Sequence, residues 1–167
     1  DISMDGEYDS GSNTVTCRAL VIDVPAVGRI TVSGRASGFS LRDVADRAKT
    51  KEARAKARLD SMTVRIENAG FVERMLDMQA AMLGGTRDDV RSQLVDGALP
   101  FALSFVENES FRTEALAALS AFLADPRSLT ITFAPEKPVP LGQAVRTAAR
   151  RPGALPDLLA PRMQAND

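Results

Sequence analysis

The sequence has no histidine and no tryptophan, and it has only one cysteine and one tyrosine among its 167 residues. Histidine is the usual side chain for proton transfer near neutral pH and a frequent neutral metal ligand. Its absence excludes Ser-His-Asp and Cys-His catalysis and weakens the case for a zinc enzyme. Carboxylates, lysines, hydroxyls and Tyr8 remain for chemistry. Composition therefore favours a protein that is not an enzyme.

The lone cysteine, Cys17, excludes an internal disulfide, so cysteine usage does not indicate a redox compartment. Cys17 lies in an alternating apolar segment, which predicts a buried structural thiol in preference to a reactive one. No metal-ligating loop and no nucleotide-binding glycine motif occurs in the sequence. We therefore expect no cofactor and no metal.

The formal net charge is only -1, which gives no long-range field of the kind that attracts nucleic acid. Nucleic acid is therefore not an expected partner. No run approaches the roughly 20 apolar residues that cross a bilayer, so no transmembrane segment is predicted. The chain begins at Asp1 inside an alternating segment, and we expect it to be a piece of a longer precursor.

Apolar and polar residues alternate in five segments, which predicts about five strands. A strand with one apolar and one polar side belongs to a sheet with one solvated face, which is typical of antiparallel pairing. The segments are the opening one, with Ile2, Met4 and Tyr8 on one side, and residues 14–24, 27–37, 61–67 and 128–134.

Helical spacing and capping signals fill the rest of the chain. Ser40 and Asp43 form a capping box, as do Thr86 and Asp89, and each box predicts the start of a helix. Gly84 and Gly85 would end a helix that begins near Phe71. Further helices are predicted over residues 110–124 and 141–150.

These elements predict an α+β fold, in which an antiparallel sheet of about five strands carries helices packed on one face. We expect one domain over residues 1–167. Residues 1–38 are β-rich, residues 39–127 are mainly helical with one strand at 61–67, residues 128–134 form a strand, and residues 135–167 are a proline-rich tail that wraps the core.

A set of apolar residues, rich in methionine, is the first candidate site. Flexible thioethers adapt to varied apolar partners, so a cavity between sheet and helices could admit an acyl chain. The same spacing is also explained by a filled core, and both interpretations stay open. The candidate ligand-binding residues are Met62, Val64, Ile66, Phe71, Met75, Met78, Met82, Phe122 and Phe133.

Residues 42–58 are the second candidate, because they hold seven basic and three acidic side chains. A basic helix can contact phosphates or lipid headgroups, but this one lacks the Trp, Phe or Leu residues of a membrane-surface helix and the aromatics that stack on bases, which favours a solvated connecting helix. The residues that would contact an anionic surface are Arg47, Lys49, Lys51, Arg54, Lys56 and Arg58. Acids such as Asp88 and Asp89 leave a carboxylate-based enzyme as a weaker alternative, and no catalytic residue is assigned.

The first half of the chain resembles proteobacterial cell-envelope proteins of the AsmA-like kind. The likeness rests on the runs DGEYDSGSNTVTCRALVIDVPAVGRITVSGRASGFS and MTVRIENAGFVERML, which share a rhythm of strands, a glycine-containing hairpin and a strand leading into an amphipathic helix. It implies a periplasmic, membrane-tethered scaffold concerned with lipid handling, and it assigns no catalytic residue. We therefore expect a non-catalytic envelope domain that binds a lipid, another apolar small molecule or a protein partner between sheet and helices.

Overall fold

The computed structural model describes residues 1–38, 40 and 55–167. Within this part of the chain a single antiparallel sheet contains seven strands, in the order β1-β2-β3-β4-β5-β7, with β6 paired to β4. The strands are β1 (Ile2–Asp9), β2 (Thr14–Val24), β3 (Gly28–Ser37), β4 (Arg58–Asn68), β5 (Ser128–Phe133), β6 (Val139–Pro140) and β7 (Pro161–Ala165). The first and last described strands thus belong to one sheet.

Helices follow β4 and β6 along the chain. They are α3 (Phe71–Leu83), α4 (Arg87–Gln93), the π-helical turn η1 (Leu94–Ala98), α5 (Leu99–Leu103), α6 (Glu109–Ala124), α7 (Leu141–Arg150), the 3-10 turn η2 (Pro152–Ala154) and α8 (Leu155–Leu159). The prediction of an α+β fold is confirmed. The helix predicted to begin at Ser40, and most of the basic segment 42–58 with it, lies outside the described residues.

The strand register places apolar side chains of six strands on one face of the sheet. One row across the strands is Ile2, Ile22, Ile30, Ile66, Leu129 and Ala165, and the next is Met4, Leu20, Val32, Val64, Ile131 and Met163. The opposite face carries ion pairs, including Arg18 with Asp5 and Glu7 at 2.8 Å each. The predicted division into an apolar and a solvated face is confirmed, because side chains alternate between the two faces along every strand.

The two strands beyond the predicted five come from residues 135–167, the segment expected only to wrap the core. Pro161 begins β7, which pairs with β5 alone and forms one edge of the sheet. Proline has no backbone N–H to donate to a neighbouring strand. It is therefore tolerated at the first residue of an edge strand, which has a neighbour on one side only. Prolines interrupt the alternation of apolar and polar residues in this segment, so the alternation did not predict strand β7.

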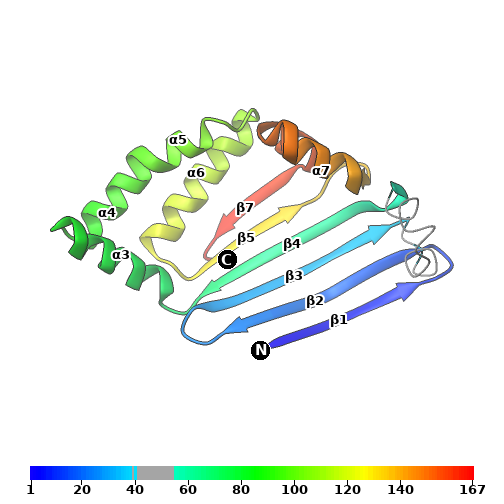
Figure 1. Ribbon diagram of the computed structural model, residues 1–167, viewed down its shortest axis with the longest axis horizontal. Coiled ribbons are helices and arrows are strands. Elements are labelled where there is room, and N and C mark those ends of the chain that lie inside the picture. Colours follow the sequence, from blue (N-terminus) through cyan, green and yellow to red (C-terminus); the bar gives the residue numbers. More distant parts are fainter. Residues whose placement is uncertain (39, 41–54) are drawn as a thin grey trace.

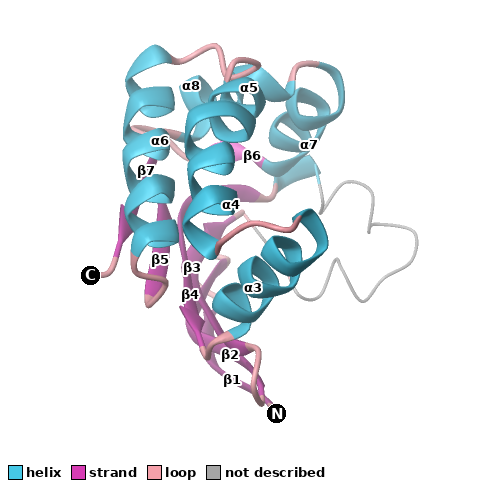
Figure 2. Ribbon diagram, turned by 90° about the vertical axis from the view of Figure 1, so that its left-hand side faces the viewer, coloured by secondary structure: helices cyan, strands magenta, loops and turns pink. Residues whose placement is uncertain are grey.

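The helices gather at the β5 and β7 side of the sheet (Figures 1 and 2). Helix α6 runs beside β7, and its Glu114 carboxylate accepts a hydrogen bond from the Met163 backbone N–H at 2.7 Å. The same carboxylate pairs with Arg162 at 2.9 Å. Helix α6 therefore covers the β7 edge, whereas no described helix lies over β1 or β2 (Figure 1).

The tightly packed core is small and lies among the helices. Leu76, Ala80 and Val90 form one buried cluster between α3 and α4. At the other end of the apolar sheet face, Ile2 is 75% exposed and Met4 is 69% exposed. The described helices thus cover only part of the apolar face.

Local signals set the helix boundaries, as predicted at Gly84 and Thr86, and in addition at Asn108, for which no cap was predicted. The Thr86 side chain accepts a hydrogen bond from the Asp89 backbone N–H, and the Asp89 side chain accepts one from the Thr86 backbone N–H, so the capping box is present. Gly84 ends α3 in the left-handed conformation at φ 70°, which suits glycine because it has no Cβ. The Asn108 side chain caps α6 by accepting from the Phe111 N–H at 2.8 Å.

The hairpin of α3 and α4 is held together by an exposed ion pair in addition to its core. Arg87 Nε donates to Asp77 Oδ1 at 2.7 Å, and the hydrogen bond to Arg87 holds the pKa of Asp77 below its ordinary value of 3.8. Hydrogen bonds from Thr86 likewise lower the pKa of Asp89. Both carboxylates are therefore stabilised in their charged form by the folded hairpin.

Acid is expected to loosen this hairpin. Since the folded pKa of Asp77 is lowered, its contribution to stability is fully present above pH 3.8 and is lost as the pH falls through the folded value. Thermal unfolding followed against pH should therefore show a steeper acid loss for the unmodified protein than for Asp77→Asn. Parallel losses in the two proteins would contradict this account.

Candidate apolar binding site

A hollow lined almost entirely by apolar side chains lies between the helices and the β5 end of the sheet. It has a volume of about 390 Å³, and its walls come from α3, η1, α5, α6 and β5. Gln79 is its only polar side chain. The other lining residues are Val72, Met75, Leu76, Leu94, Leu99, Leu119, Phe122, Leu123 and Leu129. The volume falls within the range of about 300–1,000 Å³ that is typical of small-molecule sites.

A second hollow of about 180 Å³ adjoins the first and shares Val72 and Phe122 with it. It reaches the apolar sheet face through Ile30, Ile66 and Phe71. Phe71 is 41% exposed and Ile30 is 37% exposed, so the apolar surface continues from the hollow to solvent. A long apolar molecule could therefore lie in the larger hollow with one end on the open sheet.

The apolar candidates predicted from the sequence divide into three groups in the structure. Ile66, Phe71, Met75 and Phe122 line the two hollows. The second group is on the same apolar sheet face and comprises Met62, Val64 and Phe133, with Met62 opposite Phe133.

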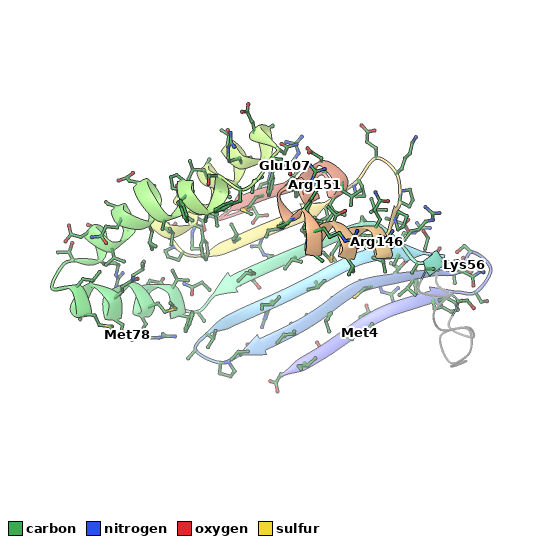
Figure 3. All side chains as sticks on the ribbon, turned by 45° about the horizontal axis from the view of Figure 1, so that its top comes forward. Met4, Lys56, Met78, Glu107, Arg146 and Arg151 are labelled. Carbon is green, nitrogen blue, oxygen red and sulfur yellow. The ribbon has the colours of Figure 1, made fainter. Side chains whose placement is uncertain are left out.

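Met78 and Met82 form the third group, on the exposed side of α3. Met78 is 60% exposed and Met82 is 80% exposed. Met78 lies on α3 beyond the end of the sheet in Figure 3, and neither residue lines the two hollows. Of the three predicted methionines of α3, only Met75 therefore reaches the site.

Sequence reasoning did not assign several leucines that line the larger hollow. Leu119, Leu123 and Leu129 belong to predicted apolar faces, so their periodicity was the available signal. Leu94 and Leu99 lie in the π-helical turn and at the start of α5, beside Gly97 and Pro100. The change of helical period there removes the regular spacing that would have identified them.

The lining of both hollows offers little chemistry. The larger hollow contains no charged side chain, whereas Arg29, Glu67 and Asn68 belong to the lining of the smaller one. Arg29 is paired with Asp23 at 2.7 Å on the solvated face of the sheet. The larger hollow therefore offers apolar contact and shape to a molecule that enters it.

Other potential functional groups are dispersed over the described residues. No cluster of three or more cysteine, aspartate or glutamate side chains suited to a metal occurs among them. None of the described helices is long and apolar enough to cross a membrane. Cys17, predicted to be buried, is half-buried on the apolar face, with its Sγ 3.7 Å from the Val32 carbonyl oxygen.

The basic candidates can be placed only in part. Arg47, Lys49, Lys51 and Arg54 lie outside the described residues. Lys56 is exposed in a helical turn, and Arg58 is exposed where β4 begins. Their role at an anionic surface stays a prediction.

Comparison with known proteins adds one finding at the level of the family. No curated protein and no solved structure matches this chain. The likeness to AsmA-like proteins stays a prediction. A family model described as "Uncharacterized protein" matches residues 21–166, which is most of the sequence, and the chain belongs to that family.

Proposed function

We propose that this protein is a non-catalytic domain of the cell envelope that binds the acyl chain of a lipid, or a similar apolar molecule, between its sheet and its helices. The observation that carries the proposal is the hollow of about 390 Å³ with a single polar side chain in its lining. Large contiguous apolar surfaces are rarely left exposed in folded proteins, because their contact with water is unfavourable.

The proposal is supported by the continuity of this apolar surface. Phe122 lines both hollows, and Ile30 extends the surface onto a sheet face whose outermost strand is largely exposed. An acyl chain is long, thin and featureless, which suits a groove that has apolar walls and no convergent polar groups. The periplasmic location is the part of the proposal that rests on the AsmA-like resemblance of the first half.

A cavity-filling variant tests ligand binding directly. Leu119 lines the larger hollow, and Leu119→Trp should occupy the space that an acyl chain would take. Binding of palmitate, measured by native mass spectrometry and by displacement of N-phenyl-1-naphthylamine, is expected in the unmodified protein and is expected to be lost in Leu119→Trp.

Leu83→Trp is the matched control, because Leu83 is 60% exposed and does not line the larger hollow. It should bind palmitate as the unmodified protein does. Far-ultraviolet circular dichroism must show that both variants are folded. The proposal fails if the unmodified protein binds neither probe, or if folded Leu119→Trp binds both undiminished.

A further inference from the structure

Helix α7 is largely exposed to solvent. None of its ten residues is buried, and the half-buried ones are Gly142, Ala144 and Thr147. Its first residue is tied to the sheet, because the Leu141 N–H donates to the Ala57 carbonyl oxygen at 2.9 Å. Figure 2 shows α7 at the margin of the helical layer. Most of the helix surface therefore faces outward.

The outward surface of α7 has an apolar stripe. Leu141 is 36% exposed and Val145 is 67% exposed. Residues four apart share one face of an α-helix, and Ala149 continues the same row. Leu141 and Val145 thus present apolar surface to water along one row of α7.

A basic row borders this stripe. Arg146 and Arg150 are also four residues apart, and both are exposed. Neither has an ion-pair partner among the described residues, and α7 contains no acidic residue. The helix therefore presents an apolar row and, on the adjoining side, two guanidinium groups that pair with no acid among residues 1–38, 40 and 55–167.

A shallow hollow beside the basic row adds a third arginine. It has a volume of about 440 Å³, and Arg146, Arg150 and Arg151 line it together with the carboxylate of Asp157. Arg151 is paired with Glu107 at 2.8 Å, and Asp157 accepts a hydrogen bond from the Asn108 amide at 2.7 Å. Figure 3 shows Arg146 on α7 and Arg151 beside Glu107. Three arginines and one aspartate thus line this hollow, and Arg146 and Arg150 form no ion pair within the part of the chain that the structure describes.

We propose that α7 is an interfacial helix that docks this protein onto the surface of an anionic phospholipid bilayer. The apolar row of Leu141 and Val145 enters the boundary between headgroups and acyl chains, and Arg146 and Arg150 contact the lipid phosphates. A bilayer is the occupant that offers both an apolar layer and a layer of negative charge along the length of a helix. This surface is separate from the apolar hollow of α3, α5 and α6, and its role is independent of ligand binding there.

Vesicle co-sedimentation tests the proposal on the whole chain. The unmodified protein should sediment with vesicles made of equal parts phosphatidylglycerol and phosphatidylcholine, and more weakly with phosphatidylcholine alone. The double variant R146E/R150E should bind the anionic vesicles about tenfold or more weakly, because each basic residue near such a surface contributes to binding. Val145→Ser should also weaken binding by removing part of the apolar row.

The matched control is R91E/R127E, which makes the same change of charge at the other end of the molecule. Arg91 and Arg127 lie in exposed ion pairs on α4 and before β5. This control should bind anionic vesicles as the unmodified protein does. Leu119→Trp should also bind them normally, so a failure of acyl-chain binding and a failure of docking can be told apart.

A single-tryptophan variant gives a second readout, since the sequence contains no tryptophan. The emission of Val145→Trp should shift to shorter wavelength with anionic vesicles, as the indole leaves water. The proposal is overturned if the unmodified protein does not sediment with anionic vesicles, which is the result expected if α7 binds a protein partner instead. It is also overturned if R146E/R150E and R91E/R127E bind the vesicles equally.

Discussion

Leu76→Ala is expected to destabilise the protein by about 2–5 kcal/mol, the range measured when large apolar side chains are truncated in protein cores. Leu76 is 5% exposed and packs with Ala80 and Val90 where α3 meets α4. The variant loses apolar burial and leaves a void beside a space that is already hollow. Because only three side chains form this buried cluster, Leu76 contributes a large part of its apolar contacts. Urea unfolding followed by circular dichroism measures the change.

Leu83→Ala is the control for this prediction. It makes the same substitution at the end of the same helix, where the side chain is 60% exposed. Its stability should stay within about 0.5 kcal/mol of the unmodified protein, as is usual for surface positions. Equal losses in the two variants would show that Leu76 is not part of a packed core.

Gly34→Ala is expected to destabilise the protein by about 1–3 kcal/mol, the cost of inserting atoms into a well-packed site. Gly34 lies in β3 opposite Cys17 of β2 and Met62 of β4. A Cβ atom there would lie 2.5 Å from the Ser61 carbonyl oxygen and 3.0 Å from Met62 Cα. Both are backbone atoms, so relief requires the two strands to move apart.

Gly97→Ala is the control, and its effect on stability is expected to be zero or of opposite sign. Gly97 lies in the π-helical turn, and no atom would come within 4 Å of an added Cβ. Alanine there should leave stability unchanged or raise it by about 0.5–1 kcal/mol, because glycine is unfavourable within helices. Chemical unfolding measures the free energy of unfolding of both variants. A Gly34→Ala variant as stable as Gly97→Ala would refute the close approach of β3 and β4.

The fold was largely readable from short-range patterns. Alternation identified the strands of residues 14–24 and 128–134 to within about a residue, and the capping box at Thr86 identified the start of α4. Both signals depend on neighbours in the sequence, either through the period of a strand or through a hydrogen bond across one turn. Strand β7 was missed because prolines interrupt its segment, and its place is set by pairing with β5 far back in the chain.

The candidate site was only partly predictable. Periodicity showed that Phe71, Met75 and Met78 are apolar residues of one helix, but it did not show which would line a hollow. Met75 and Phe71 reach the two hollows while Met78 is exposed. Which side chains of α3 line a hollow is set by the packing of α3 against α6 and the sheet. That packing consists of contacts between residues far apart in the sequence.

The sequence by itself determined the chemistry that this protein has available and the periods of its helices and strands, because these follow from residue type and from interactions over a few residues. Tertiary structure alone decided that the apolar face is only partly covered, that leucines from η1, α5 and α6 converge on one hollow, and that α7 turns Val145 and Arg146 outward. The reason is that burial is set by the packing of elements distant along the chain, which residue spacing does not specify.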